Sequence, residues 1–437
     1  MPNNSGILIA KLNYFYPALL GIGYARYRKN RIQKNYFDFN QVDDLLRIVN
    51  NSILDIPFYR EEYSTPISTL KEFYERIEFI DKDIVMSNWE DFILPGVTEK
   101  EIIAGTTGGT SGKPLKLVLP KNRYVFELAT MYTMWKNVGW DGQTRAVIRN
   151  RHLKDNQPFT VNPIKKEIIF DGFRTSNAYY FKVYSILRRY KIGFIHAYPS
   201  SAYQFASFLD REKLDVGFIK AFLCGSEALL PEHKELIKQR LGINIYHWYG
   251  HSEKLVLGGY CKGSDLIHIE PTYGYFELID ENGNPINEIG KTGEIVGTTL
   301  HNPYMPLIRY RTGDYAEYAG NYCSECKRHL PLLKNITGRW DINRIFLKDC
   351  TYITITALNL HNDLYSYIEG MQYIQKEKGK LEILLIKGPA YDTEIEDRFI
   401  DHFDKSFNHK CEFQIKYVSS LEKEPNGKFL PLKQYVS

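Results

Sequence analysis

A cluster of hydroxyl side chains and glycines is the segment of this sequence best suited to chemistry. Its members are Thr106, Thr107, Gly108, Gly109, Thr110, Ser111 and Gly112. Glycine lets backbone N–H groups approach an oxygen closely, so a loop of this composition suits the binding of phosphate groups. The segment is not a P-loop, because Lys113 is followed by Pro114 and not by serine or threonine. We predict a phosphate-binding loop of another kind; for this segment alone, a plain surface turn is the alternative.

Further motifs place charged groups next to turns. Ser252 and Glu253 follow an apolar run, where the hydroxyl can bond a phosphate and the carboxylate can hold Mg²⁺. Asp314 ends a Tyr-Arg-Thr-Gly-Asp turn and suits ribose hydroxyls, and Arg339 adds a guanidinium group downstream. Lys428 lies in an Asn-Gly-Lys turn near the C-terminus. Each motif is weak by itself. Lys428, for example, could be a solvated surface residue, as a lysine on an exposed turn usually is.

The order of these motifs resembles that of the adenylate-forming ligases, which include acyl- and aryl-CoA synthetases, luciferases and the adenylation domains of peptide synthetases. The resemblance covers most of the chain. Within the superfamily the sequence is most similar to the phenylacetate-CoA ligase branch and its relatives encoded with capsular polysaccharide genes, through residues 57–61 (PFYRE), 198–201 (YPSS) and 306–311 (PLIRYR).

This resemblance implies an enzyme that uses ATP and Mg²⁺ to join a small carboxylic acid to AMP, with release of pyrophosphate. The acyl group would then pass to CoA or to an amine, such as a sugar amine in surface polysaccharide biosynthesis. Residues 106–112 would close over the β- and γ-phosphates, Ser252 would contact the α-phosphate and Glu253 would coordinate Mg²⁺.

The resemblance also assigns the remaining nucleotide-binding and catalytic roles. Tyr249 would stack near the adenine. The other residues so implied are Gly225, Ser226, Glu227 and Gly250 in loops beside the nucleotide, Asp314 and Arg339 at the ribose, Asp341 at a hinge and Lys428 as the catalytic lysine. Attack of a carboxylate on the α-phosphorus brings two anions together, so Lys428 on a mobile domain can bridge them and then leave by rotation about Asp341.

The cysteines form a second pattern. Cys323 and Cys326 have the two-residue gap that lets both thiolates bind one zinc ion, and Cys261 and His268 lie upstream. Four protein ligands leave no open position for catalysis, so we predict a structural zinc site. The pattern of cysteines and histidine resembles that of relatives in the phenylacetate-CoA ligase branch. The alternative is two partly buried free thiols. Six cysteines in a long chain without a signal peptide indicate a reducing compartment, and hence a cytoplasmic location.

Composition excludes several classes of protein. The net charge is +4 without long runs of one sign, which argues against a nucleic-acid partner. Residues 6–24 are fairly apolar, but Lys11, Asn13 and Pro17 interrupt them, so no transmembrane span is predicted. Peripheral contact between this segment and anionic lipid stays open, because basic residues follow it. The sequence does not indicate an oligomeric state.

The pattern of apolar residues predicts an α/β fold. After a helical region at 41–78, helical and β-branched stretches alternate, which is typical of a layered, largely parallel sheet. The helices are predicted at 123–137, 179–190, 203–212 and 232–240, and the strands at 146–148, 194–197, 221–224 and 243–248. Turn residues within 273–300 predict an antiparallel, β-rich subdomain.

Two domains are predicted. Residues 1–340 would form the large domain that binds ATP and the acid, and residues 341–437 a small, mobile α+β domain that carries the catalytic lysine. In the second, strands are predicted at 351–356 and 381–386, a helix at 394–403 and a last strand at 412–418.

The acid pocket is the least determined part of the site. By analogy it would be lined by residues 149–152, by 196–203 and by the loops at Gly225 and Gly250. The aromatic residues Tyr198, Tyr203, Trp248 and Tyr249 could hold a planar acid or belong to the core. Arg149, Arg151 and His152 could bind a second carboxylate or a sugar, or they could be solvated.

A non-catalytic function is the alternative to a ligase. The chain could be a nucleotide-binding partner within a polysaccharide-assembly complex that has kept the fold without turnover. The presence of Glu253, Asp314, Arg339 and Lys428 argues for catalysis.

Overall fold

The computed structural model describes residues 41–107, 115–121, 123–149, 151–163, 165–338, 344–349, 351–358, 360, 363–422 and 430–436. Eight of the predicted site residues lie outside these ranges: Gly108, Gly109, Thr110, Ser111, Gly112, Arg339, Asp341 and Lys428. The apolar segment 6–24 does too. No helix in the described ranges combines the length and apolar character needed to span a membrane.

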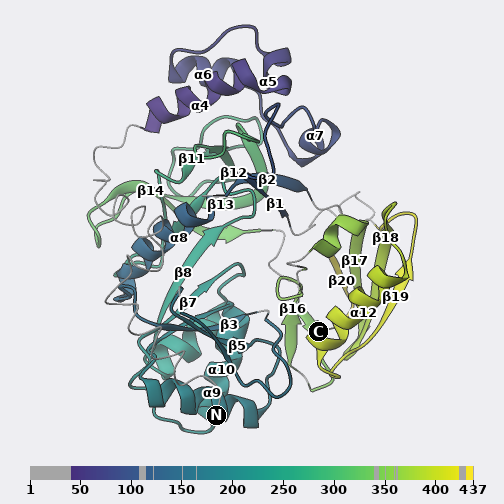
Figure 1. Ribbon diagram of the computed structural model, residues 1–437. Coiled ribbons are helices and arrows are strands. Elements are labelled where there is room, and N and C mark those ends of the chain that lie inside the picture. The colour runs from purple at the N-terminus through teal and green to yellow at the C-terminus, as the bar shows by residue number, and fades with distance from the viewer. Residues whose placement is uncertain are drawn as a thin grey trace.

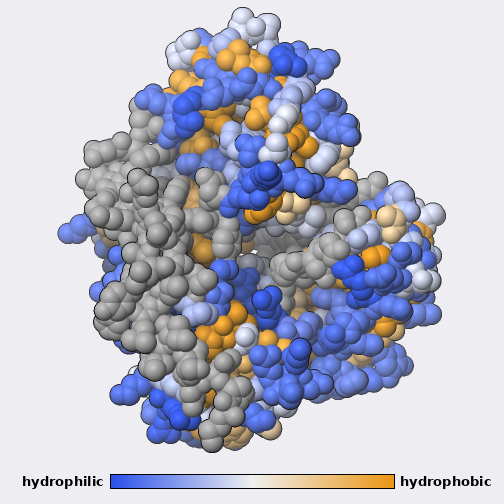
Figure 2. All heavy atoms as spheres, viewed as in Figure 1, coloured by the Kyte–Doolittle hydropathy of each residue, from blue (hydrophilic) through white to orange (hydrophobic). Residues whose placement is uncertain are grey.

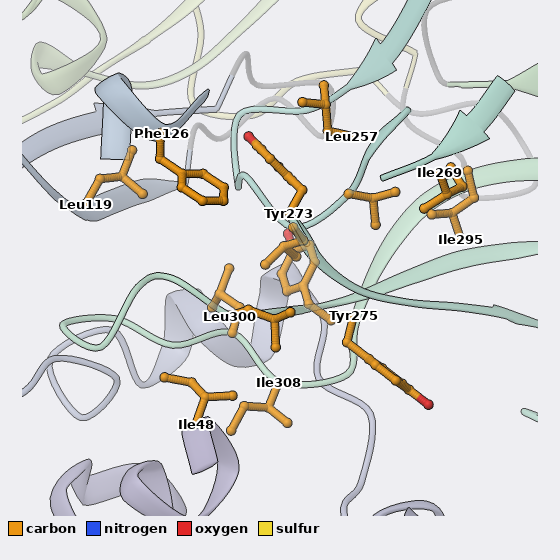
Figure 3. Packing of buried hydrophobic residues seen from close by; sticks show 14 of the residues in the cluster. Ile48, Leu119, Phe126, Leu257, Ile269, Tyr273, Tyr275, Ile295, Leu300 and Ile308 are labelled. Carbon is orange, nitrogen blue, oxygen red and sulfur yellow. The ribbon is translucent and has the colours of Figure 1, made fainter. Parts of the chain in front are cut away.

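The described chain begins with helices, as predicted. They are α4 (Gln41–Asp55), α5 (Pro57–Glu62), α6 (Leu70–Arg76) and α7 (Lys82–Ser87). Helix α4 buries Leu45, Ile48 and Val49, whose spacing places them on one helical face. Ile48 belongs to the same buried cluster as Ile308, which follows a strand of the large sheet (Figure 3). The N-terminal helices therefore extend the core of the strands below them (Figure 1).

A single sheet of twelve strands forms the body of the protein, in the order β11-β12-β13-β14-β10-β9-β8-β7-β6-β3-β5-β4. Its strands are β3 (Arg145–Arg149), β4 (Thr160–Asn162), β5 (Glu167–Asp171), β6 (Phe194–Ala197), β7 (Ala221–Gly225), β8 (Asn244–Gly250), β9 (Leu257–Gly259), β10 (Ile267–Ile269), β11 (Gly274–Ile279), β12 (Thr292–Thr299), β13 (Tyr310–Tyr322) and β14 (His329–Thr337). The predicted mixed α/β fold is confirmed. The sequence does not reveal, however, that the parallel and antiparallel parts share one hydrogen-bonded sheet.

The parallel part contains β5, β3, β6, β7 and β8, which pair in that order. Helices α8 (Arg123–Met134) and η1 (Trp135–Val138) precede β3, and the helices between the later strands are α9 (Asn177–Tyr190), α10 (Pro199–Arg211), α11 (Pro231–Lys234) and η2 (Glu235–Arg240). Helices α9 and α10 bury aromatic and aliphatic side chains against β6 and β7 in one cluster. Since parallel strands end at the same edge of a sheet, the loops after them lie together.

The C-terminal elements form a second, smaller hydrophobic cluster. They are β15 (Arg344–Phe346), β16 (Tyr352–Thr354), η3 (Asp363–Tyr367), β17 (Ile368–Glu377), β18 (Lys380–Lys387), α12 (Thr393–Phe407), β19 (Glu412–Tyr417) and β20 (Leu432–Gln434). Strand β17 was not predicted from the sequence. The prediction that the strand at 412–418 is the last one is wrong, because β20 follows it and pairs with β17. The visible face of these elements is mostly hydrophilic (Figure 2). The boundary at 340/341 stays a prediction.

Candidate active site

Motifs that are far apart in the sequence border one cavity of about 670 Å³. The predicted site residues that line it are Thr107, Ser226, Glu227, Tyr249, Gly250, Ser252, Glu253 and Asp314. A volume of this size is typical of small-molecule sites. Thr106 and Gly225 adjoin lining residues in the chain without lining the cavity themselves.

The carboxyl ends of the parallel strands bring several of these residues together. Strand β7 ends at Gly225 and β8 at Gly250, and the two strands pair in parallel with Gly225 opposite Trp248. Ser226 turns the chain with a φ of 70°, in the left-handed region. Arg149 ends β3 in the same sheet. The site therefore occupies the edge at which open α/β sheets usually bind ligands.

A hydrogen bond joins the predicted adenine and ribose residues. The Tyr249 hydroxyl donates to Oδ2 of Asp314 at 2.9 Å. Burial, and then the charge of Asp314, raise the pKa of Tyr249 well above its ordinary value, so the phenol stays protonated and donates. Asp314 lies within β13, where the register against β12 shifts and Gly313 has a φ of 70°, so the predicted turn is an irregularity of a continuous strand. The bond fixes both the aromatic ring and the carboxylate beside it.

His251 donates a hydrogen bond that favours the ionised form of Glu253. Nε2 of His251 accepts a hydrogen bond from the Val256 N–H at 3.2 Å, so Nδ1 carries the proton and donates to Glu253 Oε2, also at 3.2 Å. Burial opposes the charge on Glu253, but the hydrogen bond from His251 leads the interactions that outweigh it, and the pKa of Glu253 is held below its ordinary value. An ionised carboxylate facing a cavity is a donor group that fits Mg²⁺.

Strands β1 (Ile102–Thr106) and β2 (Lys116–Pro120) carry the two ends of the hydroxyl-rich loop, as predicted, and pair with each other antiparallel. Beyond the last strand pair, the Thr107 N–H donates to Leu115 O and the Leu115 N–H donates to the Thr107 hydroxyl, both at 3.0 Å. Because that hydroxyl accepts the bond, it keeps its own hydrogen to donate.

Glu227 has partners that the sequence analysis did not foresee. Its Oε2 accepts a hydrogen bond from the Ser200 N–H at 3.0 Å, and its Oε1 accepts one from the Thr354 hydroxyl of β16. Burial raises the pKa of Glu227, and these hydrogen bonds oppose that rise. The carboxylate thus links the cavity wall to a C-terminal strand, a contact between residues 127 positions apart that leaves no local signal in the sequence.

The predicted acid-pocket residues divide into two groups. Arg149 lines the cavity, together with His196, Tyr198 and Trp248. Outside it, Arg151 is exposed. His152 stacks on Phe173 with ring centroids 4.2 Å apart, and Tyr203 lies 4.9 Å from the His233 ring. The sequence analysis missed further lining residues: Arg123, Glu127, Trp135, Arg145, Glu167 and Lys254.

The predicted zinc ligands converge on one point. All four ligand atoms of Cys261, His268, Cys323 and Cys326 lie within 4.8 Å of one another. The Cys261 and Cys323 sulfurs are 3.9 Å apart, and tetrahedral Zn–S bonds of about 2.3 Å would put them about 3.8 Å apart. His268 Nδ1 lies 2.9 Å from the carbonyl of Leu266, while its buried Nε2 has no hydrogen-bond partner within the described ranges. That Nε2 is the orphaned atom a metal would satisfy.

Known proteins match the chain in both halves. A family model described as the CapK C-terminal domain matches residues 349–434. Protein CapK of Staphylococcus aureus is 21% identical over 442 residues, which cover 92% of this chain and 93% of CapK. The phenylacetate-coenzyme A ligase of Pseudomonas putida is 30% identical over 165 residues, so the match spans 37% of this chain and 37% of the ligase.

Solved structures match the fold over most of its length. The structure of 2-hydroxyisobutyryl-CoA ligase in complex with R3-HIB-AMP has a TM-score of 0.55 at 15% identity, covering 90% of this chain and 88% of that one. The fold is therefore that of the adenylate-forming CoA ligases. The chain is a relative of the phenylacetate-CoA ligases and of CapK, which confirms the predicted resemblance.

Proposed function

We propose that the chain is an ATP-dependent carboxylate ligase that forms an acyl-adenylate and then transfers the acyl group. The observation that carries the proposal is the convergence of Thr107, Tyr249, Glu253 and Asp314 on one cavity. Relatives named as CoA ligases, and solved structures of a CoA ligase holding an acyl-AMP compound, support the same chemistry.

The residues of the cavity divide the work of adenylation. Tyr249 and Asp314, held together by their hydrogen bond, bind the adenosine. Glu253 stays ionised beside His251 and holds the Mg²⁺ of the nucleotide. A magnesium ion held there would supply positive charge to the phosphate oxygens. Ser252 donates to the α-phosphate, and Lys428 neutralises the attacking carboxylate.

The acceptor in the second step is CoA or an amine. CoA is the first acceptor to test, because the similar proteins include ones whose names identify them as CoA ligases. An amine of a sugar or amino acid is the second, and its support is the resemblance of the sequence to relatives encoded with capsular polysaccharide genes. Rotation about Asp341 would remove Lys428 from the site and admit either acceptor.

We also propose that the protein binds a structural zinc ion. Cys261 follows β9, His268 lies in β10, and Cys323 and Cys326 lie at the turn between β13 and β14. Zinc bound by all four would tie this hairpin to the edge of β10 and have no open position for substrate. Its role is therefore to hold the sheet together.

Acid-dependent pyrophosphate release tests the proposed function. The full chain is incubated with ATP, Mg²⁺ and a panel of aryl, fatty, amino and uronic acids, beside a Glu253→Gln variant that keeps the shape of the side chain. We expect release with at least one acid and a loss of about 10²-fold or more in the variant. Release from no acid, with ATP still bound, would favour a non-catalytic nucleotide-binding partner. CoA and amino sugars are then compared as acceptors with the active acid.

A further inference from the structure

Three aromatic rings enclose part of the cavity. Trp135 of η1, His196 of β6 and Trp248 of β8 have ring centroids 5.3, 5.5 and 5.7 Å apart in pairs. All three line the cavity. Aromatic walls by themselves suit a planar or ring-shaped acid. The polar atoms near these rings restrict the chemistry of the ligand further.

The guanidinium of Arg149 is fixed against this aromatic enclosure. It donates to Nε2 of His196 at 3.0 Å and to the Ser226 hydroxyl at 3.1 Å, and it lies 4.2 Å from the centroid of the Tyr198 ring. Each of these partners is uncharged. Burial, and then the charge of Arg149, hold the pKa of His196 well below its ordinary value, so its ring stays neutral.

The neighbouring cations of the cavity already have carboxylate partners. Arg145 pairs with Glu167 at 2.5 Å, and Lys254 pairs with Glu127 at 2.8 Å. Arg149 makes no ion pair with any residue in the ranges the structure describes. A guanidinium against a cavity wall without an acid partner is suited to bind an anion from the ligand.

The buried polar atoms without partners at this end are all donors. Since His196 Nε2 accepts from Arg149, its Nδ1 carries the hydrogen, and that atom is buried without a partner in the part of the chain that the structure describes. Nε1 of Trp135 and Nε of Arg149 are also buried without partners among the described residues. These three atoms are closed off from the cavity in the observed arrangement, whereas the Arg149 side chain as a whole lines it and brings a positive charge to its wall.

We infer that the acid substrate carries a second carboxylate in addition to the one that reacts, and that Arg149 binds it. This inference rests on the proposed function. The substrate class is a dicarboxylic acid, of which an acidic ring compound suits the aromatic walls best. Arg149 binds the distal carboxylate, and His196 is a positioning residue whose Nε2 holds the guanidinium.

Matched pairs of acids test the inference on the full chain. Terephthalate is compared with 4-methylbenzoate, and adipate with hexanoate, by pyrophosphate release and by calorimetric binding. The variants are Arg149→Met, Arg149→Lys and the control Arg151→Met, whose wild-type arginine is exposed and outside the cavity. We expect a dicarboxylate to be preferred by about tenfold or more, and Arg149→Met to abolish that preference while ATP binding is unchanged. Arg149→Lys should keep part of the preference.

Two outcomes overturn the inference. Equal or better use of the monocarboxylates would do so, and so would an equal loss for both members of a pair in Arg149→Met, because Arg149 would then act on the reacting carboxylate. Failure of the proposed function gives a different result: no acid releases pyrophosphate, yet calorimetry still shows a dicarboxylate bound by the wild type and not by Arg149→Met. If no dicarboxylate binds in calorimetry either, the inference is wrong.

Discussion

Adding one methyl group at Gly225 should disable the site without unfolding the protein. Gly225 ends β7, directly opposite Trp248 of β8. A Cβ atom at this position would lie 2.3 Å from Cε2 of Trp248 and 2.6 Å from its Nε1. Ordinary contact begins at 3.4 Å, so the tryptophan ring or the strand must move by at least 1.1 Å, the difference between 3.4 and 2.3 Å.

Trp248 cannot move without disturbing the cavity. It is 7% exposed and packs against Trp135 and His196 in the aromatic enclosure. Forcing an extra carbon into a packed core costs about 1–3 kcal/mol of stability. A displacement of about 1 Å at a reacting group can cost about 10²-fold in rate. Gly225→Ala should therefore lose about 10²-fold in pyrophosphate release and a few degrees in Tm.

The assay compares Gly225→Ala with Gly217→Ala. Gly217 is an exposed glycine in the loop before β7, where a Cβ would meet only a side-chain oxygen of Asp215 at 3.3 Å. Acid-dependent pyrophosphate release and thermal unfolding are measured for both variants and the wild type. The control should keep both properties. Wild-type activity in Gly225→Ala, at an unchanged Tm, would refute the packing argument.

Three further predictions concern the nucleotide, the zinc ligands and pH. Tyr249→Phe removes the hydrogen bond to Asp314 and should raise KM for ATP about tenfold with little change in kcat, because one bond to a charged group is lost; an unchanged KM would count against this role. Cys326→Ser should lose bound zinc and lower Tm, measured by elemental analysis and calorimetry; a wild-type protein purified without zinc would contradict the site. Burial lowers the pKa of His247 from 6.5 to about 4 in the folded protein, so its contribution to stability is complete above pH 6.5 and is lost as the pH falls toward 4. The decline of Tm between these values should be shallower in His247→Gln, and identical slopes would refute this assignment.

Element types were predictable where one hydrophobic period dominates. The strand predicted at 194–197 is observed as β6 (Phe194–Ala197), and the helix predicted at 179–190 is observed as α9 (Asn177–Tyr190). Strand β17 escaped prediction because Gln372 and Gln375 are fully buried within it. Gln372 donates to the carbonyls of Glu422 and Leu430, so a polar side chain fills a core position that the sequence pattern assigns to apolar residues.

Features of the fold and site that depend on contacts between distant residues could not be predicted from the sequence. The antiparallel part joins the parallel part where β9 pairs with β8, and β14 reaches β9 only through β10, by pairs such as His268 with Leu332 that no local pattern encodes. The turn motifs at Tyr249, Glu253 and Asp314 were recognisable because each is short and contiguous. Trp135, by contrast, lies in a helical stretch that looks like ordinary core, and only the fold turns it toward the cavity.

The most direct test of the central claim follows an oxygen atom from acid to nucleotide. The acid identified by the panel is labelled with oxygen-18 in its carboxylate, and the products formed with the acceptor are examined by mass spectrometry. In an adenylate mechanism the acid oxygen attacks the α-phosphorus and remains with AMP when the acyl carbon is transferred. We predict AMP carrying one heavy oxygen, and no label in AMP from Lys428→Ala. Label in inorganic phosphate, with unlabelled nucleotide, would show an acyl phosphate and contradict the account.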